Sequence, residues 1–378
     1  MEPTLRLLKA LVGIDSVNPS LVHGAAGEAD VARAIAAECR AIGLETHLQE
    51  AAPDRPNVIG VLNGRAPGRS LMFCGHIDTV GVAGMTRPFD PVERDGRIYG
   101  RGSQDMKAGV AAMIGAARVI AESGGLAAGR IIVACVVDEE HASIGADALV
   151  TSWRADAAVV TEPTELQVAV AHKGFEWVEV ETEGRAAHGS RPRDGRDAIM
   201  RMGRVLGALE SLDRTLQAGR SHALVGAASL HASLIEGGRE LSSYPDRCSL
   251  QIERRTIPGE PQGAAGREVA AIIDRLKAED AEFEAASRVL FARSPYEIAP
   301  GHPLPGALVG AMAAAGHKSD TIGMSFWTDA AVLGDAGIPS VLFGPTGAGL
   351  HSLEEWVDAQ SVLTCRDALV HLARQWCV

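Results

Sequence analysis

The first half of the chain alternates between short apolar runs and longer stretches with helical spacing. Residues 130–137, RIIVACVV, are almost continuously apolar, which predicts a strand buried on both faces of a sheet. Helical spacing covers residues 26–42, where it stops before Gly43, and residues 106–121. Shorter apolar runs predict further strands at residues 57–62, 70–74 and 157–160. This alternation predicts an α/β domain with a largely parallel sheet covered by helices.

The pattern changes near residue 173. Residues 175–182, FEWVEVET, alternate apolar and polar positions as a half-exposed strand does. The next segments predict a helix, two strands, a helix and a strand at residues 197–212, 227–234, 248–254, 264–277 and 282–291. Two helices on one face of an antiparallel sheet would make a compact α+β unit. Because the α/β rhythm returns from residue 305, we expect one α/β domain, residues 1–172 and 293–378, with a second domain, residues 173–292, inserted into it.

Length, charge and cysteine spacing narrow the classes of function. The 378 residues suit two domains, and a net charge of -12 makes the chain a poor partner for nucleic acid or an anionic membrane. Residues 1–14 read as a short amphipathic helix and lack the order of regions that a signal peptide has. No apolar run reaches membrane-spanning length, and the six cysteines form no C-x-x-C pair. We therefore expect a soluble, cytoplasmic protein without a disulfide framework.

Five short segments concentrate residues that can bind a metal, and each follows an apolar run or opens a predicted helix. They are Gly75-His76-Ile77-Asp78, Gly102-Ser103-Gln104-Asp105, Asp138-Glu139-Glu140, Thr161-Glu162 and Leu350-His351. Such positions are where α/β folds place their sites. A histidine and an aspartate two apart project to the same side of an extended chain, so one could bind a metal while the other orients it. Three adjacent acids repel one another, and nearby positive charge would relieve that repulsion.

Each segment also has a plainer interpretation when it is taken singly. A histidine and an aspartate two apart after a strand more often make a hydrogen-bonded turn. An acidic pair at the end of a strand is more often a solvated rim. Five such segments at the element ends of one α/β domain favour a shared metal site over five unrelated turns.

The motifs GHIDTV, GRGSQDMKAG, DEE, TEPT, AHGSRP, ERRTIPGE and GLHSLEEW follow one another along the chain. With this set the sequence resembles, over nearly its whole length, the metallohydrolase family of acetylornithine deacetylase, succinyl-diaminopimelate desuccinylase, aminoacylase and carboxypeptidase G. The resemblance implies a zinc-peptidase-like α/β catalytic domain with an inserted ferredoxin-like α+β domain for dimerisation or as a lid. It implies an amide-bond hydrolase of amino-acid metabolism that removes an N-acyl group from an amino acid. The alternative within the same fold is a metallo-dipeptidase or a carboxypeptidase.

Carried over residue by residue, the resemblance implies two zinc ions per chain. One ion would be bound by His76, Asp105 and Glu162, and the other by Asp105, Glu140 and His351. Asp105 would bridge the two ions, and the three ligand carboxylates would offset three of their four positive charges. Zinc accepts a mixed set of histidine and carboxylate ligands, and cobalt or manganese could replace it.

The resemblance also implies catalytic roles. Asp78 would hold His76 in its ligating tautomer. Glu139, the acid of its cluster that is left free, would take a proton from the attacking water and deliver it to the leaving amine. A rival interpretation, a binding protein that keeps the fold without activity, would be marked by loss of this free acid. The family further implies a cis peptide bond between Asp105 and Met106.

Three residues of the inserted domain are candidates for substrate contacts. His188, which on sequence alone reads as a turn histidine, matches a family histidine that reaches the partner subunit's active site and stabilises an oxyanion. We therefore expect a homodimer. Arg255 matches the arginine that grips a substrate carboxylate, although it also reads as a surface strand arginine. Ser242 stands where many relatives have an asparagine, which leaves the acyl group of the N-acyl amino acid or dipeptide substrate open, and Trp327-Thr328-Asp329 is expected to line the pocket.

Overall fold

Two units divide the chain in the computed structural model, which describes residues 2–378 and leaves Met1 outside the described residues. Unit 1 comprises the chain up to Val170 together with Ile298–Ile322 and Thr328–Val378. Unit 2 comprises Ala171–Glu297 and Gly323–Trp327. None of the helices within residues 2–378 combines the length and the apolarity that crossing a membrane requires.

Nine strands form the largest sheet. They are β1 (Glu45–Ala52), β2 (Arg55–Asn63), β3 (Ser70–His76), β6 (Arg130–Val136), β7 (Ala157–Val160), β8 (Val168–His172), β15 (Tyr296–Glu297), β16 (Thr321–Met324) and β17 (Ser340–Leu342). Their order is β1-β2-β6-β3-β7-β17-β8-β15, with β16 beside β8. The sheet is mixed rather than largely parallel: the central strands β6, β3, β7 and β17 pair in parallel, whereas β1 with β2, β2 with β6, β17 with β8 and β8 with β15 pair antiparallel. The turn Pro53-Asp54 between β1 and β2 is too short for a parallel crossover, so this flank is antiparallel.

The carboxyl ends of the central strands meet at one edge of the sheet. β3 ends at His76, β6 at Val136 and β7 at Val160, and these strands are almost wholly buried. Because β3 pairs in parallel with both β6 and β7, the residues that follow the three strands emerge side by side. The polar residues placed there are Asp78, Asp138, Glu139, Glu140 and Glu162.

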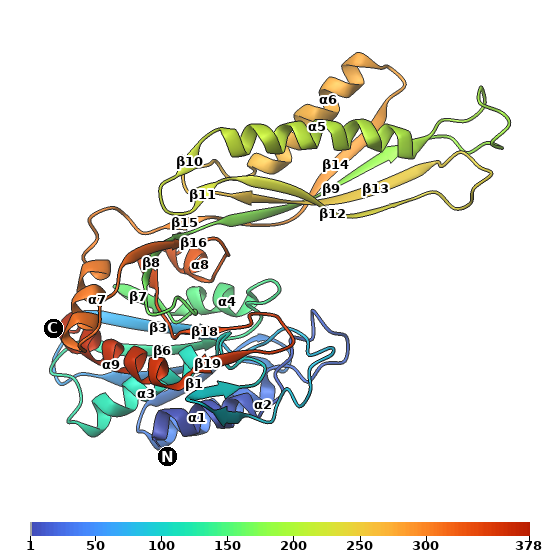
Figure 1. Ribbon diagram of the computed structural model, residues 1–378. Coiled ribbons are helices and arrows are strands. Elements are labelled where there is room, and N and C mark those ends of the chain that lie inside the picture. Colours follow the sequence, from blue (N-terminus) through green and yellow to red (C-terminus); the bar gives the residue numbers. More distant parts are fainter. Residues whose placement is uncertain (1) are drawn as a thin grey trace. The chain divides into compact units, whose positions relative to one another are not determined.

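Helices cover both faces of this sheet in unit 1. They are α1 (Pro3–Val12), α2 (Ala29–Ala41), α3 (Lys107–Glu122), α4 (Ile144–Ser152), α7 (Pro303–Ala314), α8 (Ala330–Asp335) and α9 (Ala359–Trp376). α3 packs against α1, α9 and β3 on one face, and α4 packs against α8 on the other (Figure 1). A Cβ at Gly109 of α3 would lie 2.0 Å from the carbonyl oxygen of Thr161, so glycine lets α3 approach the end of β7. The peptide bond between Asp105 and Met106, just before α3, is cis, as predicted.

Unit 2 is built on a four-stranded antiparallel sheet and two helices. Its elements in chain order are β9 (Gly174–Glu183), α5 (Ala198–Ala218), β12 (Ser229–Gly237), β13 (Arg247–Thr256), α6 (Ala264–Glu279) and β14 (Glu284–Arg293). The strands lie in the order β12-β13-β9-β14. This succession of elements is the ferredoxin-like arrangement, so the predicted α/β protein with a ferredoxin-like α+β insertion is confirmed.

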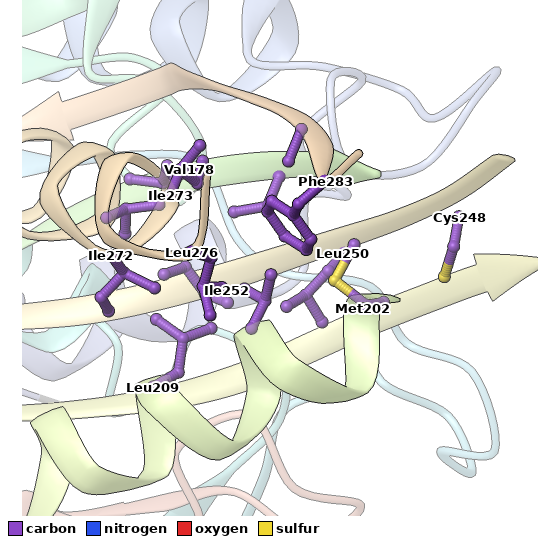
Figure 2. Close-up of a cluster of buried hydrophobic side chains, with 14 of the residues drawn as sticks. Val178, Met202, Leu209, Cys248, Leu250, Ile252, Ile272, Ile273, Leu276 and Phe283 are labelled. Carbon is purple, nitrogen blue, oxygen red and sulfur yellow. The ribbon is translucent and has the colours of Figure 1, made fainter. Parts of the chain in front are cut away.

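The core of unit 2 lies between its sheet and its two helices. Figure 2 shows Val178 of β9 and Ile252 of β13 near Met202 and Leu209 of α5 and Leu276 of α6. Along β13 every second residue is buried, so one face of the strand meets the helices while the other face is more exposed. Apolar alternation therefore fixes which face of the sheet the helices cover.

Two smaller sheets are present among the described residues. One contains β18 (Gly347–Ala348), β19 (Trp356–Asp358), β5 (Arg97–Tyr99) and β4 (Val92–Arg94), and the other contains β10 (Ser221–His222) and β11 (Gly226–Ala227). In the first, β19 pairs with β5. That pairing joins the segment that follows His351 to the segment that precedes Asp105.

Candidate metal centre

The five residues expected to bind metal lie together at the carboxyl edge of the central strands of unit 1. His76 ends β3, Glu140 follows β6, and Glu162 follows β7. Asp105 precedes α3, and His351 lies between β18 and β19. The fold thus brings together side chains from five separate connections of the chain.

Asp105 lies between the two histidines. Its Oδ1 is 3.1 Å from His76 Nε2, and its Oδ2 is 3.2 Å from His351 Nε2. His351 Nε2 also lies 3.1 Å from Glu140 Oε2, and His76 Nε2 lies 3.9 Å from Glu162 Oε1. Two sets of donor atoms therefore share Asp105, one with His76 and Glu162 and the other with His351 and Glu140.

The spacing and the donor atoms fit zinc. A tetrahedral zinc ion binds nitrogen and oxygen ligands at about 2.0–2.2 Å, which holds any two ligand atoms roughly 3.3–3.6 Å apart. The histidine–carboxylate distances within the two donor sets run from 3.1 to 3.9 Å, a range that brackets this separation. Glu140 Oε1 is buried without a hydrogen-bond partner, and a carboxylate oxygen left in that state costs free energy. A cation beside Glu140 would supply the missing partner.

The cluster carries more buried negative charge than its histidines balance. Burial and the neighbouring carboxylates raise the pKa of Glu139 and of Glu162 well above the usual range. Burial also opposes ionisation of Asp105, but its hydrogen bonds to His351 and His76 hold its pKa below the usual range. The hydrogen bonds of His351 to the carboxylates of Asp105 and, second in effect, Glu140 raise the pKa of His351 to about 10. Divalent cations would take over the balancing of this charge from protons.

Glu139 is as near to the cluster as one of the candidate ligands. Its Oε2 lies 4.0 Å from His76 Nε2, against 3.9 Å for Glu162 Oε1. Ligand atoms of Glu139, His76 and Glu162 also lie within 4.8 Å of one another. The negative charge of the buried Asp329 adds to the raised pKa of both glutamates. By distance alone, Glu139 and Glu162 are equivalent neighbours of His76.

Asp78 is fully buried behind His76. Its backbone carbonyl oxygen is 3.0 Å from His76 Nδ1, whereas its carboxylate Oδ1 is 3.5 Å away. The nearer acceptor of the Nδ1–H is therefore the carbonyl, and this bond leaves the Nε2 lone pair facing Asp105. The carboxylate accepts hydrogen bonds from the backbone N–H groups of Glu139 and Glu140. Asp78 thereby connects the histidine of β3 to the acidic loop after β6.

Glu355, to which the sequence analysis assigned no role, holds the loop that presents Asp105. Its Oε1 accepts the backbone N–H groups of Gln104 and Asp105 at 2.8 and 3.0 Å. Its Oε2 accepts the backbone N–H of Gly102 at 3.0 Å and Arg101 Nη1 at 2.7 Å. Glu355 follows the second candidate histidine by four residues, so one carboxylate ties together two connections of the metal centre.

Replacing Glu355 with Ala is expected to destabilise the metal-free protein by about 3–5 kcal/mol, because it leaves the Arg101 guanidinium buried without its counter-charge. Urea unfolding in the presence of a chelator measures this change. The matched control is Glu354→Ala at the exposed neighbouring position, for which a change of about 0.5 kcal/mol or less is expected. Equal stability of the two variants would show that the contacts of Glu355 contribute nothing to folding.

His188 and Ser242 belong to adjoining loops of unit 2. His188 is exposed, and its Nδ1 accepts the backbone N–H of Ser190 at 3.2 Å. Because Nδ1 accepts, the proton of a neutral His188 is on Nε2, where it can be donated. The backbone oxygen of Ser242, also exposed, accepts the N–H of Gly189 at 2.7 Å.

Arg255 lies on β13 with 22% of its side chain exposed. Its guanidinium donates to Glu253 at 3.1 Å and to the backbone oxygen of Ser325 at 2.9 Å, and it lies over the ring of Phe175. The neighbouring Arg254 points to the opposite face, is fully buried and pairs with two glutamates of unit 2. Of the two arginines, only Arg255 has donor atoms within reach of solvent.

Comparison with known proteins assigns the chain to a family. The model of peptidase family M20/M25/M40 matches residues 72–375. The chain belongs to this family. The M20 chain is 30% identical over 339 residues to the acetylornithine deacetylase of Myxococcus xanthus, which covers 87% of this chain and 86% of that protein.

Two further similarities extend over almost the entire M20 chain. It is 26% identical over 408 residues to the N-formyl-4-amino-5-aminomethyl-2-methylpyrimidine deformylase of Bacillus subtilis (strain 168), covering 100% of this chain and 95% of that protein. The solved structure of the Bacillus subtilis YXEP protein, a dinuclear metal binding peptidase from the M20 family, matches with a TM-score of 0.74. That match has 16% sequence identity and covers 99% of this chain and 97% of that one.

These findings confirm the predicted metallohydrolase family and the prediction of an enzyme. M20 proteins are metal-dependent hydrolases, and relatives of this chain act on amide bonds. The fold, with a catalytic unit and a ferredoxin-like unit, is the fold of the family's solved structures.

Proposed function

We propose that this M20 hydrolase is a dinuclear zinc enzyme that removes the N-acyl group from an acylated amino acid. The observation that carries the proposal is the position of Asp105, whose two oxygens each face a different histidine at hydrogen-bond distance. A carboxylate shared in this way suits a bridging ligand between two ions. The similarity to a deacetylase over most of both chains supports the acyl amino acid as the class of substrate.

In the proposed centre, His76, Asp105 and Glu162 would hold one zinc ion, and Asp105, Glu140 and His351 would hold the other. Cobalt or manganese could occupy the same donor set. When bound, the two ions would polarise the amide carbonyl and lower the pKa of a water towards about 7. The protein supplies the orientation of the donors, which Glu355 and the Asp78 carbonyl fix from behind.

Glu139 is proposed as the general base and then the general acid. Its carboxylate lies 4.0 Å from His76 Nε2, at the edge of the proposed zinc ligands. From there it would accept a proton from the attacking water and donate it to the nitrogen of the leaving amine. Its backbone N–H is held by the Asp78 carboxylate at 3.1 Å, which limits how far the loop can move.

Arg255 and Ser242 are proposed to contact the amino-acid part of the substrate. A guanidinium can bind a carboxylate through two parallel hydrogen bonds, and Arg255 keeps part of its side chain open to solvent. Ser242 offers a shorter polar group than the asparagine of many relatives, so the acyl group accepted here should differ from theirs. We also propose that the enzyme works in the cytoplasm, where its six free, buried cysteines would stay reduced.

His188 is proposed to donate its Nε2–H to the oxyanion formed at the amide carbon, in the active site of a partner subunit. The homodimer that this requires is supported by edge strand β12, where Leu234 and Ile235 are 65% and 56% exposed. An apolar strand with one unpaired edge is a ready surface for a second copy of the chain.

Replacing Ile235 with Lys is expected to convert the dimer to a monomer, because the lysine charge would be buried in the interface. Analytical ultracentrifugation measures the change in mass. The control is Leu48→Lys on β1, an equally exposed leucine on an edge strand of the other sheet, which should leave the mass unchanged. A dimer that survives the Ile235 substitution would exclude this edge as the interface.

The test of function is a panel of N-acetyl, N-succinyl and N-formyl amino acids together with dipeptides, with the released amine measured by ninhydrin. The proposal expects at least one N-acyl amino acid to be turned over faster than every dipeptide. Faster hydrolysis of dipeptides would favour the alternative, a metallo-dipeptidase or carboxypeptidase, which the similarity in fold to a dinuclear peptidase supports. Equal turnover after complete removal of metal would contradict both.

A further inference from the structure

A buried polar network lies behind the metal centre, at the start of the chain and away from the proposed ligands. Its centre is Asn18, which is fully buried and lies in the turn between α1 and α2. Asn18 Nδ2 donates to Asp78 Oδ2 at 2.8 Å and to Asp138 Oδ1 at 3.0 Å. One amide group therefore bridges two buried carboxylates.

The orientation of the Asn18 amide is fixed by its surroundings. Its Oδ1 accepts the backbone N–H of Ser20 at 2.8 Å and Nη2 of Arg55 at 3.2 Å. If the amide were flipped, its NH₂ group would face these donors and its oxygen would face two carboxylates. All four hydrogen-bonding positions of the amide are thus satisfied in a single arrangement.

Arg55 supplies the positive charge in this network. Arg55 Nη2 lies 2.8 Å from Asp138 Oδ1, and the same guanidinium binds the buried carboxylate of Glu28 through two of its nitrogens. Arg55 therefore shares its single positive charge between Asp138 and Glu28, whereas Asp78 has no cation among these partners. The negative charge of Asp78 is left to act on His76, whose Nδ1 is 3.5 Å from Oδ1.

Asp78 and Asp138 together determine where the acidic loop after β6 lies. Asp78 accepts the backbone N–H groups of Glu139 and Glu140. Asp138 has a positive φ of 69° and accepts the backbone N–H of Ala142, which shapes the turn that follows. A shift of the Asp78 carboxylate would therefore move both glutamates, and a shift of the Asp138 carboxylate would move the turn that follows them.

We infer that Asn18 is a positioning residue for the metal centre: it holds Asp78 and Asp138, and Asp78 orients His76 through its backbone carbonyl and the Glu139-Glu140 loop through its carboxylate. Without its donors, the two acids would face each other across a buried gap and repel. The hydrogen bonds of the Asn18 side chain go to Asp78, Asp138, Ser20 and Arg55 and to none of the proposed ligands, so it acts through Asp78 and Asp138. This inference rests on the proposed dinuclear centre and adds to it a residue far from the ligands in the chain.

The test replaces Asn18 with Leu, which has the same branched shape and number of non-hydrogen atoms, adds no charge and removes all four hydrogen bonds. Zinc affinity is measured by competition with a fluorescent chelator, and the cobalt form is examined by visible absorption. Affinity is expected to fall about 10–100-fold, as when an outer hydrogen-bond partner of a ligand is lost, with a changed cobalt spectrum. Asn18→Ser, which keeps one donor, should show a smaller loss and covers the case in which the leucine variant fails to fold.

The matched control is Asn57→Leu. Asn57 is also a fully buried asparagine of unit 1, with bonds to Gly145 and Val137 but none to Asp78. It should lose stability while its zinc affinity and cobalt spectrum stay as in the wild type. If wild-type protein binds two ions and the Asn18 variants bind them equally well, the inference is overturned and the proposed function stands. If wild-type protein binds fewer than two ions, the proposed function itself fails.

Discussion

Replacing Glu139 with Gln is expected to lower kcat by about 10²–10⁴-fold while the protein keeps its two metal ions. Glutamine has the shape of glutamate and can still bind the same neighbours, but it cannot carry a proton between water and the leaving amine. The measurement pairs turnover of the best substrate from the panel with metal content by inductively coupled plasma mass spectrometry.

Glu139 and Glu162 lie at almost the same distance from His76, so this experiment has to distinguish their roles. Their nearest oxygens lie 4.0 and 3.9 Å from the same nitrogen of His76, so geometry gives them equal access to an ion. Glu162→Gln is therefore the comparison to make, and it is expected to weaken binding of one ion. If Glu139→Gln loses metal and Glu162→Gln keeps it, the two roles have to be exchanged.

A conservative control separates these effects from the removal of any glutamate. Glu122→Gln at the exposed end of α3 removes a surface charge paired with Arg118 and should change neither turnover nor metal content. Full activity of Glu139→Gln beside an unchanged control would mean that another group moves the proton. Asp329, buried near both glutamates, would be the first residue to examine in that case.

The parts of the fold that follow from local pattern were predictable from the sequence. The apolar run at 130–137 became β6, and the small-residue stretch at 106–121 became α3, because each pattern is set by burial on all sides. β1 was missed, since an edge strand with the sequence ETHLQEAA buries none of its residues fully and has no apolar alternation. The antiparallel flank of the sheet was missed with it.

In the candidate site too, residues recognisable from their local sequence were predicted, and residues defined by distant contacts were not. Residues that offer a ligand atom, such as His76 and Asp105, stand in short motifs whose residue types state the chemistry. Residues that hold the ligands in place cannot be recognised from a local motif, because their partners lie far along the chain. Asn18 is 60 residues from Asp78, and Glu355 is 250 residues from Asp105. An asparagine before a proline reads as a turn, and nothing in that local signal points to a buried carboxylate.

Replacing Asp105 with Asn is expected to weaken binding of both ions and to abolish measurable turnover. The loss of affinity should exceed the about 10–100-fold loss that follows when a residue hydrogen-bonded to a metal ligand is removed. An amide can offer one oxygen where the carboxylate offers two, and the oxygens of Asp105 face different histidines. The lost negative charge adds to the effect, because three carboxylates are needed to offset most of the charge of two ions. Zinc titration by calorimetry measures both sites in one experiment.

The comparison that gives this result its meaning is His351→Ala. His351 lies beside Asp105 and Glu140, which belong with it to one of the two donor sets. Its loss should therefore remove one ion and leave the other bound. Two ions lost from the Asp105 variant and one from the His351 variant is the pattern that only a shared carboxylate produces. If each variant loses a single ion, Asp105 belongs to one site alone, and the paired metals would then be held by separate sets of ligands. Because the backbone N–H of Asp105 is bound by Glu355 whatever its side chain is, the loop should keep its shape in the variant, and the loss can be read as a loss of ligand atoms.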